Sequence, residues 1–482
     1  MGLPLLLGAT SSARTVAGSA LAAAALPVMT LTLWLTHSSL AAPAAAIAIA
    51  TLLVLAPDRL PKLATLLVAG AGSSLLFAAA EQRDALTRGL PTPDAAQQGD
   101  EMLAVVLVVC AGVALVQAGI SLVARYGKRP AWTVPSRRIT VVLSAVGIAC
   151  AVVVALAAGV PGKLSDRWDA FTREGSGNQP TATRATFKEP GELFDPATSG
   201  RYKFWESAVD ANASSPLVGI GPGTFEFWWA REHESGGFAR DAHSTFLEVL
   251  GELGIIGLVL LGGFATAVLV VGAVRCLRAP PQLRLGLATA TAACAVFTAA
   301  AVADWSWELG VVPVLYLMLA AVVVTAGAVV PRPLASPTGR DPLSLLRRYG
   351  PRSAIAALGV AAVIVIAIPL AGSVFLERSR TDAREGDLSG ALEEARTAAR
   401  LQPYAASPRL QEALVYEQMG DFDSAADAAT LATEKEATNW RPWFILSRLE
   451  ARRGDADAAV EAYHQARLLD PADLPKEIHP VP

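Results

Sequence analysis

The residue best suited to acid–base chemistry is His243, at the end of a long polar segment over residues 161–245. Arg240 and Asp241 come just before it, and an apolar run starts just after it. An imidazole titrates near neutral pH, so a histidine at a membrane–water boundary beside charged residues is a suitable general base. The alternative interpretation is that His243 only caps the apolar helix, next to Asp241.

Arginines in the same segment could bind a phosphate group. Arg201 follows a Ser-Gly pair and precedes Trp205, while Arg231 and Arg240 come later. A guanidinium binds phosphate or carboxylate oxygens through paired hydrogen bonds. The structural alternative for Arg201 is that it caps a loop helix or forms an ion pair within it, with Glu206 as the partner.

The glycine-rich stretch Gly219–Gly223 lies between these arginines. It lacks the lysine and the strand–helix context of a phosphate-binding P-loop. We therefore expect a tight turn that folds the segment back over the site.

Acidic and aromatic residues alternate in a second short segment, from Asp304 through Trp305 and Trp307 to Glu308. Tryptophans in such a position most often anchor a membrane helix at the interface. They could instead stack on a sugar while Asp304 or Glu308 binds its hydroxyls. A pair of glycosidase carboxylates is a further interpretation, but the sequence does not fix their separation.

The elements that carry these residues are apolar helices. The chain of 482 residues is 53% hydrophobic and 17% charged, below the roughly 25% charge of soluble domains. Apolar runs of about 20 residues, the length that crosses a bilayer, recur along it. We predict nine spans, over residues 16–36, 40–56, 62–80, 102–124, 139–160, 246–274, 284–303, 310–330 and 353–375.

Arginine and lysine are distributed unevenly between the loops that join these spans. If the N-terminus is cytoplasmic, the inner loops carry almost all of them, and the short outer loops carry only Arg83 and Arg88. The positive-inside rule then places the loop 161–245 and the C-terminal tail outside the cytoplasm. No span has a charge near its centre, which argues against a transporter.

The tail has an internal repeat. Gly386, Gly420 and Gly454 are 34 residues apart, and an aspartate follows each of them. Two sets of alanines keep the same step: Ala391, Ala425 and Ala459, and Ala398, Ala432 and Ala466. This period, with small residues at these offsets, resembles the tetratricopeptide repeat of paired helices.

Several other classes of site are not indicated. The four cysteines lie in or beside apolar runs without metal-ligand spacing, so we interpret them as packing residues. The net charge of −3 and the lack of basic clusters with aromatics give no indication of nucleic-acid binding. The first apolar run is long for a signal peptide, so we expect a retained span.

Taken together, the Arg201–Trp205 segment, the glycine-rich turn and the histidine ahead of Gly254 resemble the O-antigen ligase and polymerase superfamily. The resemblance covers roughly residues 15–330 and implies a bacterial inner-membrane glycosyltransferase of the GT-C kind. It implies a polyprenyl-diphosphate-linked glycan donor, transfer with inversion, and no metal ion or other cofactor. By position, His243 and Arg201 match the catalytic residues of the family's outer loop. It also implies more spans before the loop than the five predicted here, so we expect N-terminal spans of the family to be missing.

The predicted fold is therefore all-α: a polytopic helix bundle with a large extracytoplasmic loop and a helical-repeat tail. The acceptor would be a glycan, a lipid or a protein of the cell envelope, with membrane lipids around the spans and a protein partner on the tail. The alternative function is a non-catalytic membrane scaffold that uses its repeats in envelope glycan assembly. The predicted parts are spans over 1–160, the catalytic-type loop over 161–245, three spans over 246–330, a cytoplasmic linker over 331–352, a last span over 353–375 and the tail over 376–482.

Overall fold

The computed structural model describes residues 1–36, 38, 40–57, 59–87, 93–126, 201–232, 238–304, 306–326 and 342–474. Within these ranges the regular structure is helical, as predicted. The chain forms two compact units. The first holds residues 1–225 and 240–330, and the second holds residues 226–239 and 331–482.

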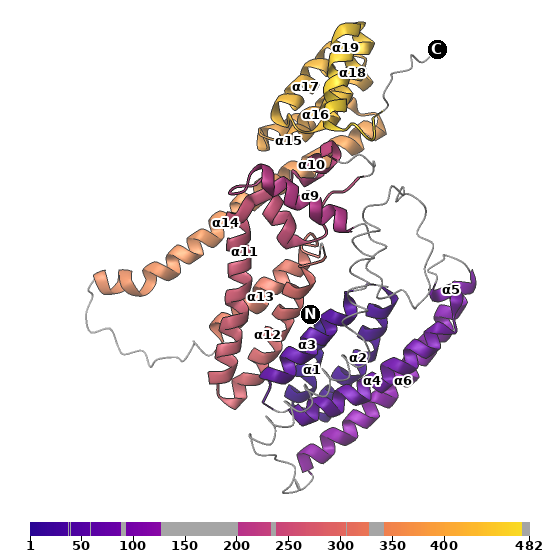
Figure 1. Ribbon diagram of the computed structural model, residues 1–482, viewed down its shortest axis with the longest axis vertical. Coiled ribbons are helices and arrows are strands. Elements are labelled where there is room, and N and C mark those ends of the chain that lie inside the picture. Colours follow the sequence, from indigo (N-terminus) through magenta and orange to yellow (C-terminus); the bar gives the residue numbers. More distant parts are fainter. Residues whose placement is uncertain are drawn as a thin grey trace. The chain divides into compact units, whose positions relative to one another are not determined.

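Apolar helices make up most of the first unit (Figure 1). Its helices are α1 (Gly2–Ser12), α2 (Val16–Leu35), α3 (Ala41–Leu55), α4 (Arg59–Glu81), α5 (Asp84–Thr87), α6 (Pro93–Tyr126), α9 (Arg201–Ser214), α11 (Thr245–Arg278), α12 (Pro281–Ala300) and α13 (Val311–Thr325). Helix α10 (Phe225–Glu232) starts at the last residue of the first unit and continues in the second.

Six described helices are long and apolar enough to cross a membrane, and they match six of the predicted spans. They lie in α2, α4, α6, α11, α12 and α14 (Pro342–Glu385). The predicted spans 40–56 and 310–330 form the shorter apolar helices α3 and α13, each of 15 residues. The predicted span 139–160 and most of the loop, residues 161–200, lie outside the described residues. The sequence did not predict the short N-terminal helix α1, whose 11 residues cannot cross a bilayer.

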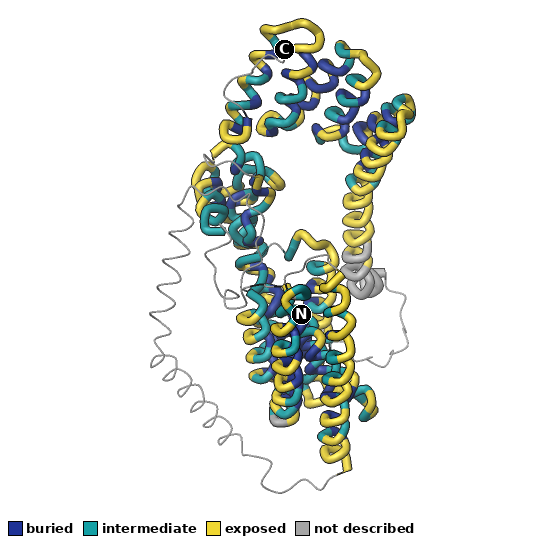
Figure 2. The backbone as a smooth tube through the Cα atoms, turned by 90° about the vertical axis from the view of Figure 1, so that its right-hand side faces the viewer, coloured by how far each residue is buried: buried dark blue, intermediate teal, exposed yellow. Residues whose placement is uncertain are grey.

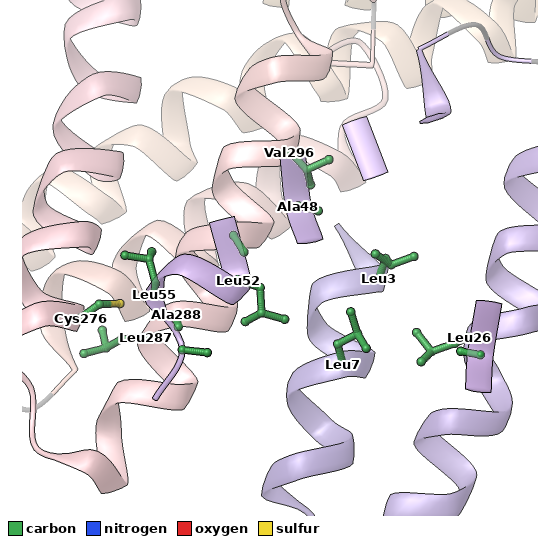
Figure 3. Packing of buried hydrophobic residues seen from close by; sticks show 13 residues of the cluster. Leu3, Leu7, Leu26, Ala48, Leu52, Leu55, Cys276, Leu287, Ala288 and Val296 are labelled. Atoms are coloured by element: carbon green, nitrogen blue, oxygen red, sulfur yellow. The ribbon is translucent and has the colours of Figure 1, made fainter. Parts of the chain in front are cut away.

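Leucines and small residues from six helices form the largest core of the first unit (Figure 3). Leu7 of α1, Leu26 of α2 and Leu52 of α3 are almost completely buried. Alanines such as Ala288 of α12 fill the space between them. Small residues allow helices to approach closely, which gives packing contacts where lipid provides no hydrophobic driving force.

A buried polar network joins helices α2, α4 and α6. Ser19 donates to the carbonyl of Thr10 (2.8 Å), and its hydroxyl accepts from Gln117 (3.2 Å) and Ser121 (3.0 Å). Thr65 of α4 donates to the amide oxygen of Gln117 (3.1 Å). No water is present in the bilayer core to satisfy these polar groups, so they bind one another. These hydrogen bonds therefore fix the packing of the three helices.

The arginines at the predicted inner loops also bind carbonyls at helix ends. Arg125 donates to the carbonyls of Ala13 (2.7 Å) and Arg14 (2.6 Å), and Arg284 donates to that of Leu55 (3.0 Å). The last carbonyls of a helix have no partner within it, and a basic side chain satisfies them. The residues that predicted orientation therefore also join neighbouring helices.

The second unit contains the long helix α14, which starts earlier than the predicted last span. Residues 342–352 of the predicted linker and the predicted last span 353–375 form one continuous helix, and residues 331–341 lie outside the described residues. The leucines and arginines before Gly350 are good helix formers, and that glycine does not end the helix. Figure 2 shows α14 as exposed over most of its described length. The tail packs on α14 at Pro369, whose carbonyl accepts from Gln402 (2.7 Å).

Five helices of 14 residues each follow α14 and repeat at the period found in the sequence. They are α15 (Leu388–Leu401), α16 (Ala406–Met419), α17 (Phe422–Lys435), α18 (Trp440–Arg453) and α19 (Ala456–Leu469). The six alanines of the repeat are all buried, so the helices approach closely at these points. The glycines before α15, α17 and α19 have φ angles of 89°, 80° and 87°, the left-handed conformation that ends the preceding helix.

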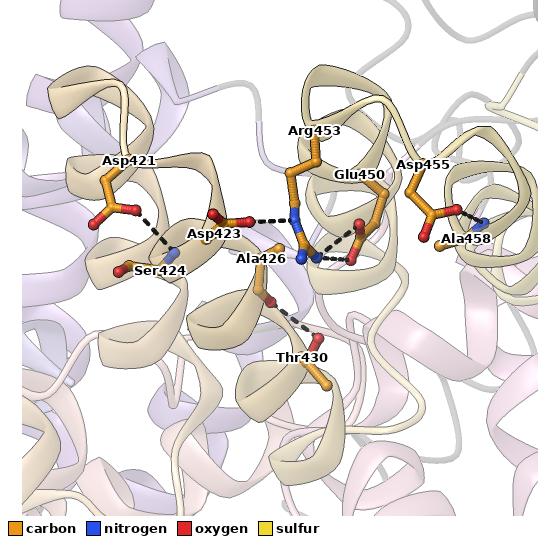
Figure 4. Close-up of polar contacts among 9 residues, drawn as sticks. All are labelled: Asp421, Asp423, Ser424, Ala426, Thr430, Glu450, Arg453, Asp455 and Ala458. Atoms are coloured by element: carbon orange, nitrogen blue, oxygen red, sulfur yellow. Dashed lines mark hydrogen bonds and ion pairs between the residues drawn. The ribbon is translucent and has the colours of Figure 1, made fainter.

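The aspartate after each glycine caps the next helix. Asp421 accepts from the backbone N–H of Ser424 (3.1 Å) and Asp455 from that of Ala458 (3.0 Å), as Figure 4 shows. Between them Arg453 binds Asp423 of the neighbouring helix (2.9 Å). In each Gly-Asp pair, the glycine therefore ends one helix and the aspartate caps the start of the next.

Candidate functional site around His243

His243 and Asp241 form a close pair in the turn that precedes α11. The Nδ1 atom of His243 lies 2.9 Å from Oδ1 of Asp241, and the backbone N–H of His243 donates to the same oxygen (3.0 Å). The side chain of His243 is 31% exposed and that of Asp241 is 14% exposed. A carboxylate that accepts from Nδ1 leaves Nε2 as the basic nitrogen of the neutral ring.

The backbone of His243 is in the left-handed region, with a φ angle of 53°. Among the described residues it alone has a positive φ without being a glycine. This conformation is costly for a residue with a side chain, and it occurs most often where function fixes the geometry. Ser244 caps α11, since its hydroxyl accepts from Leu247 N–H (3.4 Å). Capping therefore does not account for His243.

Helix α9 brings Phe204 and Arg201 to this turn. The ring of Phe204 stacks on that of His243, with centroids 5.3 Å apart and planes inclined by 28°. Arg201 and Trp205 lie three residues before Phe204 and one after it, so they share one side of the helix. Arg201 is near enough that its positive charge lowers the pKa of His243. The structure thus brings Arg201 and His243 together.

The short segment after α12, residues 301–304, forms hydrogen bonds with both helices that carry the site, α9 and α11. The carbonyl of Ala301 accepts from Thr245 N–H (3.0 Å), and that of Ala303 accepts from Nη1 of Arg201 (3.1 Å). The carbonyl of Asp304 accepts from the Thr245 hydroxyl (3.5 Å). Arg201 thus binds this segment, and no described contact pairs it with Glu206. Its Nε–H is buried and has no hydrogen-bond partner in the described residues.

The glycine-rich turn packs against a break in α11. Helix α11 is interrupted at Gly254, which has φ 66° and ψ −167°. The N–H groups of Ile255 and Ile256 bind the carbonyls of Pro216 (2.9 Å) and Leu217 (3.3 Å) instead of their own helix. In return, N–H groups of the turn bind carbonyls of α11: Ile220 binds Gly251 (3.0 Å) and Gly221 binds Glu252 (2.9 Å).

Only glycine fits at the two points where these backbones meet. A Cβ atom on Gly219 would lie 2.2 Å from the carbonyl carbon of Glu252, and one on Gly254 would lie 2.3 Å from that of Leu217. Gly219, like Gly254, has a positive φ, of 70°. The predicted tight turn is confirmed, and the break of α11 that receives it is a feature the sequence did not predict.

Glu252 holds the end of the same turn. Its carboxylate accepts from the N–H groups of Gly223 (2.8 Å) and Phe225 (3.0 Å), the residues that start α10. A carboxylate at a helix N-terminus satisfies free N–H groups and opposes the positive end of the helix dipole. Glu252 is therefore a structural acid, and the sequence gave it no role.

Asp241 and His243 each stabilise the charged form of the other. The hydrogen bond to Asp241, with its negative charge, raises the pKa of His243, against burial and the charge of Arg201, which lower it. Burial alone would raise the pKa of Asp241, but hydrogen bonds to His243 and the charges of His243 and Arg240 lower it overall. The imidazole is thus a stronger base than an isolated histidine.

The other predicted residues lie in different surroundings. Arg240 is exposed, and its charge acts on Asp241. Arg231 belongs to the second unit, where its Nε binds Glu232 (2.8 Å) and its guanidinium lies over Trp228 (4.9 Å). Asp304 is half-buried beside the start of α11. Trp305 lies outside the described residues. In the described part of the chain no group of three His, Cys, Asp or Glu side chains could hold a metal ion.

Comparison with known families gives a direct indication of function. Residues 102–262 match a family model described as O-antigen ligase. The matched range contains Arg201, Trp205, Arg231, Arg240 and His243, and it ends before Asp304 and the tail. It covers less than half of the chain. The match supports the O-antigen ligase superfamily and a membrane protein of the glycan ligase or polymerase type. A search of curated proteins finds no match.

Proposed function

We propose that the chain is a membrane glycosyltransferase that moves a glycan from a polyprenyl diphosphate to an acceptor of the cell envelope. The observation that carries this proposal is the Asp241–His243 pair, stacked on Phe204 and within electrostatic reach of Arg201. A base and a phosphate-binding cation in one place are what such a transfer requires. The family match over residues 102–262 supports the same reaction class.

In the proposed reaction, Nε2 of neutral His243 accepts the proton of an acceptor hydroxyl. The hydroxyl oxygen attacks the anomeric carbon, and the bond from that carbon to the diphosphate oxygen breaks with its electron pair on the leaving group. Attack from the opposite side inverts the configuration. Asp241 stabilises the imidazolium that forms, as a carboxylate on Nδ1 does in other acid–base pairs.

Arg201 would bind the leaving diphosphate. One end of its guanidinium is fixed on the carbonyl of Ala303 (3.1 Å), which orients the group. The buried Nε–H, which has no described partner, is then available for a phosphate oxygen. Arg240, Trp205 and Asp304 are further candidates for substrate contact, and Arg231 is a weaker one because it belongs to the second unit. No residue is assigned to a metal, since the leaving group would be neutralised by arginine.

The proposal places the loop and the tail on the outer side of a bacterial inner membrane. The distribution of arginines between the loops supports this orientation. The 34-residue period of helices α15 to α19 supports a tetratricopeptide-like tail. Such a tail would bind the acceptor or a protein partner.

The test is transfer of a labelled lipid-linked glycan by the purified full-length protein. We expect His243→Ala to lower the rate by about 100-fold or more, as loss of a general base does. Arg201→Ala should also lower the transfer rate strongly. Arg201→Lys should keep part of the wild-type rate, because lysine retains the positive charge but lacks the paired hydrogen-bond donors. His464→Ala, on the exposed surface of α19, is the matched control. Undiminished transfer by both alanine variants would overturn the proposal.

The non-catalytic scaffold makes the opposite prediction. In that case, removal of residues 380–482 abolishes the cellular phenotype, while His243→Ala has no effect. The two functions are therefore separated by the same pair of variants in cells.

A further inference from the structure

One arginine of the repeat tail binds a segment that belongs to the loop in sequence. Arg441, near the start of α18, forms an ion pair with Glu226 of α10 (3.2 Å). Its guanidinium also lies over the rings of Phe227 (5.8 Å) and Phe238 (5.7 Å). Residues 226–239 and the tail form one compact unit. We call residues 226–232, 238 and 239 the aromatic arm.

The tail holds Arg441 in place for this contact. Its guanidinium lies over Trp440 (5.5 Å), and its backbone N–H donates to the side chain of Asn439 (3.0 Å). Asn439 in turn donates to Glu436 (2.9 Å). A guanidinium among three aromatic rings and one carboxylate is bound by both its charge and its flat faces.

The aromatic arm is joined directly to the candidate base. It ends at Ala239, and Arg240 leads into the Asp241–His243 turn. Ala239 itself is 5% exposed, so the end of the arm is packed. The left-handed backbone of His243 is a strained conformation, which persists only where the surrounding chain holds it.

We propose that Arg441 is a positioning residue: the tail binds the aromatic arm and thereby fixes the turn that presents His243. The tail is then a working part of the transferase, in addition to any partner that it binds. This inference rests on the proposed function for its effect on transfer, but the binding of the arm can be measured without it.

The first experiment measures hydrogen exchange of the full-length protein in detergent. In Arg441→Ala we expect the amides of residues 227–232 to exchange about tenfold faster or more, because the ion pair and the ring contacts are lost. Arg448→Ala is the matched control, because this arginine of α18 binds Glu417 within the tail. It should leave the arm unchanged. Equal exchange of the arm in wild type and Arg441→Ala would overturn the proposal.

The second experiment uses charge reversal with transfer as the readout. Arg441→Glu should release the arm and lower kcat about tenfold, with little change in KM for the donor, since Arg201 remains. Adding Glu226→Arg should restore both arm protection and most of kcat, which a general folding defect would not do. Released arm amides with an unchanged kcat would overturn the positioning role. Slow exchange in wild type together with no transfer by any form would contradict the proposed function instead.

Discussion

The repeat tail and the segment around His243 both bend the chain with left-handed residues, but their surroundings differ. In the tail, Gly386, Gly420 and Gly454 end one helix, and nothing lies within 4 Å of the Cβ that each lacks. In the site segment, the backbone at Gly219 packs directly on the backbone of Glu252, and the backbone at Gly254 packs directly on that of Leu217. The tail glycines are needed for conformation alone, and the site glycines are needed for conformation and for space.

The two regions also differ in how far apart their partners are in the sequence. The aspartate caps of the tail bind N–H groups three residues away, as Asp455 binds Ala458. In the site, Arg201 binds Ala303 and Ile220 binds Gly251. Local contacts are reproduced in each repeat, whereas the site depends on contacts between distant segments. The site should therefore be far more sensitive to single small changes than the tail.

The largest effect is expected for Gly254→Ala. The added methyl group would meet the carbonyl of Leu217, and the positive φ adds strain, so the cost should be about 3 kcal/mol or more. The amides of Ile255 and Ile256 should then exchange roughly 100-fold faster in the full-length protein. Gly262→Ala, in the helical part of α11 with open space around it, is the control. Equal exchange in the two variants would show that the break does not depend on close packing.

Gly454→Ala tests the same conformation without the crowding. Its φ of 87° disfavours a side chain, but the space is open, so we expect a loss of only about 1 kcal/mol. Hydrogen exchange of the N–H groups at the start of α19 is the measurement. An effect as large as that of Gly254→Ala would remove the distinction between the two regions.

The smallest effect is expected for the pH dependence of Asp241→Asn. The carboxylate raises the pKa of His243, so its removal lowers that pKa. Transfer requires the neutral imidazole and rises with pH through this pKa. The acid limb of kcat/KM should therefore move to lower pH, and the plateau should fall because the base is weaker. Asp210→Asn, on the exposed side of α9, should leave the profile in place. A shift to higher pH would contradict the assigned pairing.

Patterns within one element predicted much of the fold. The length of the apolar runs located six described helices that are long and apolar enough to cross a membrane, and the spacing of Gly386, Gly420 and Gly454 located the helix boundaries of the tail. These signals lie within one helix or one repeat, so composition and period reveal them. The short helix α1 was missed because its 11 residues have neither the length of a span nor a polar face.

The site was predicted in part. The type and position of Arg201 and His243 indicated their chemistry, and the structure places them together. Neither the ring contact of Phe204 nor the binding of Arg201 to Ala303 follows from spacing, because each joins segments far apart in the chain. In the sequence, Gly254 looks like an ordinary glycine in an apolar run, so the helix break there was not predicted. Its role depends on Gly219, which packs on it from the loop.

The central claim, that His243 is the base, is tested most directly by chemical rescue. His243→Gly suits the left-handed backbone and leaves space beside Phe204 for a free imidazole. We expect glycan transfer to fall about 100-fold or more, and added imidazole to restore part of it in proportion to its neutral form. His243→Gly protein that transfers glycan at the wild-type rate without imidazole would contradict the account.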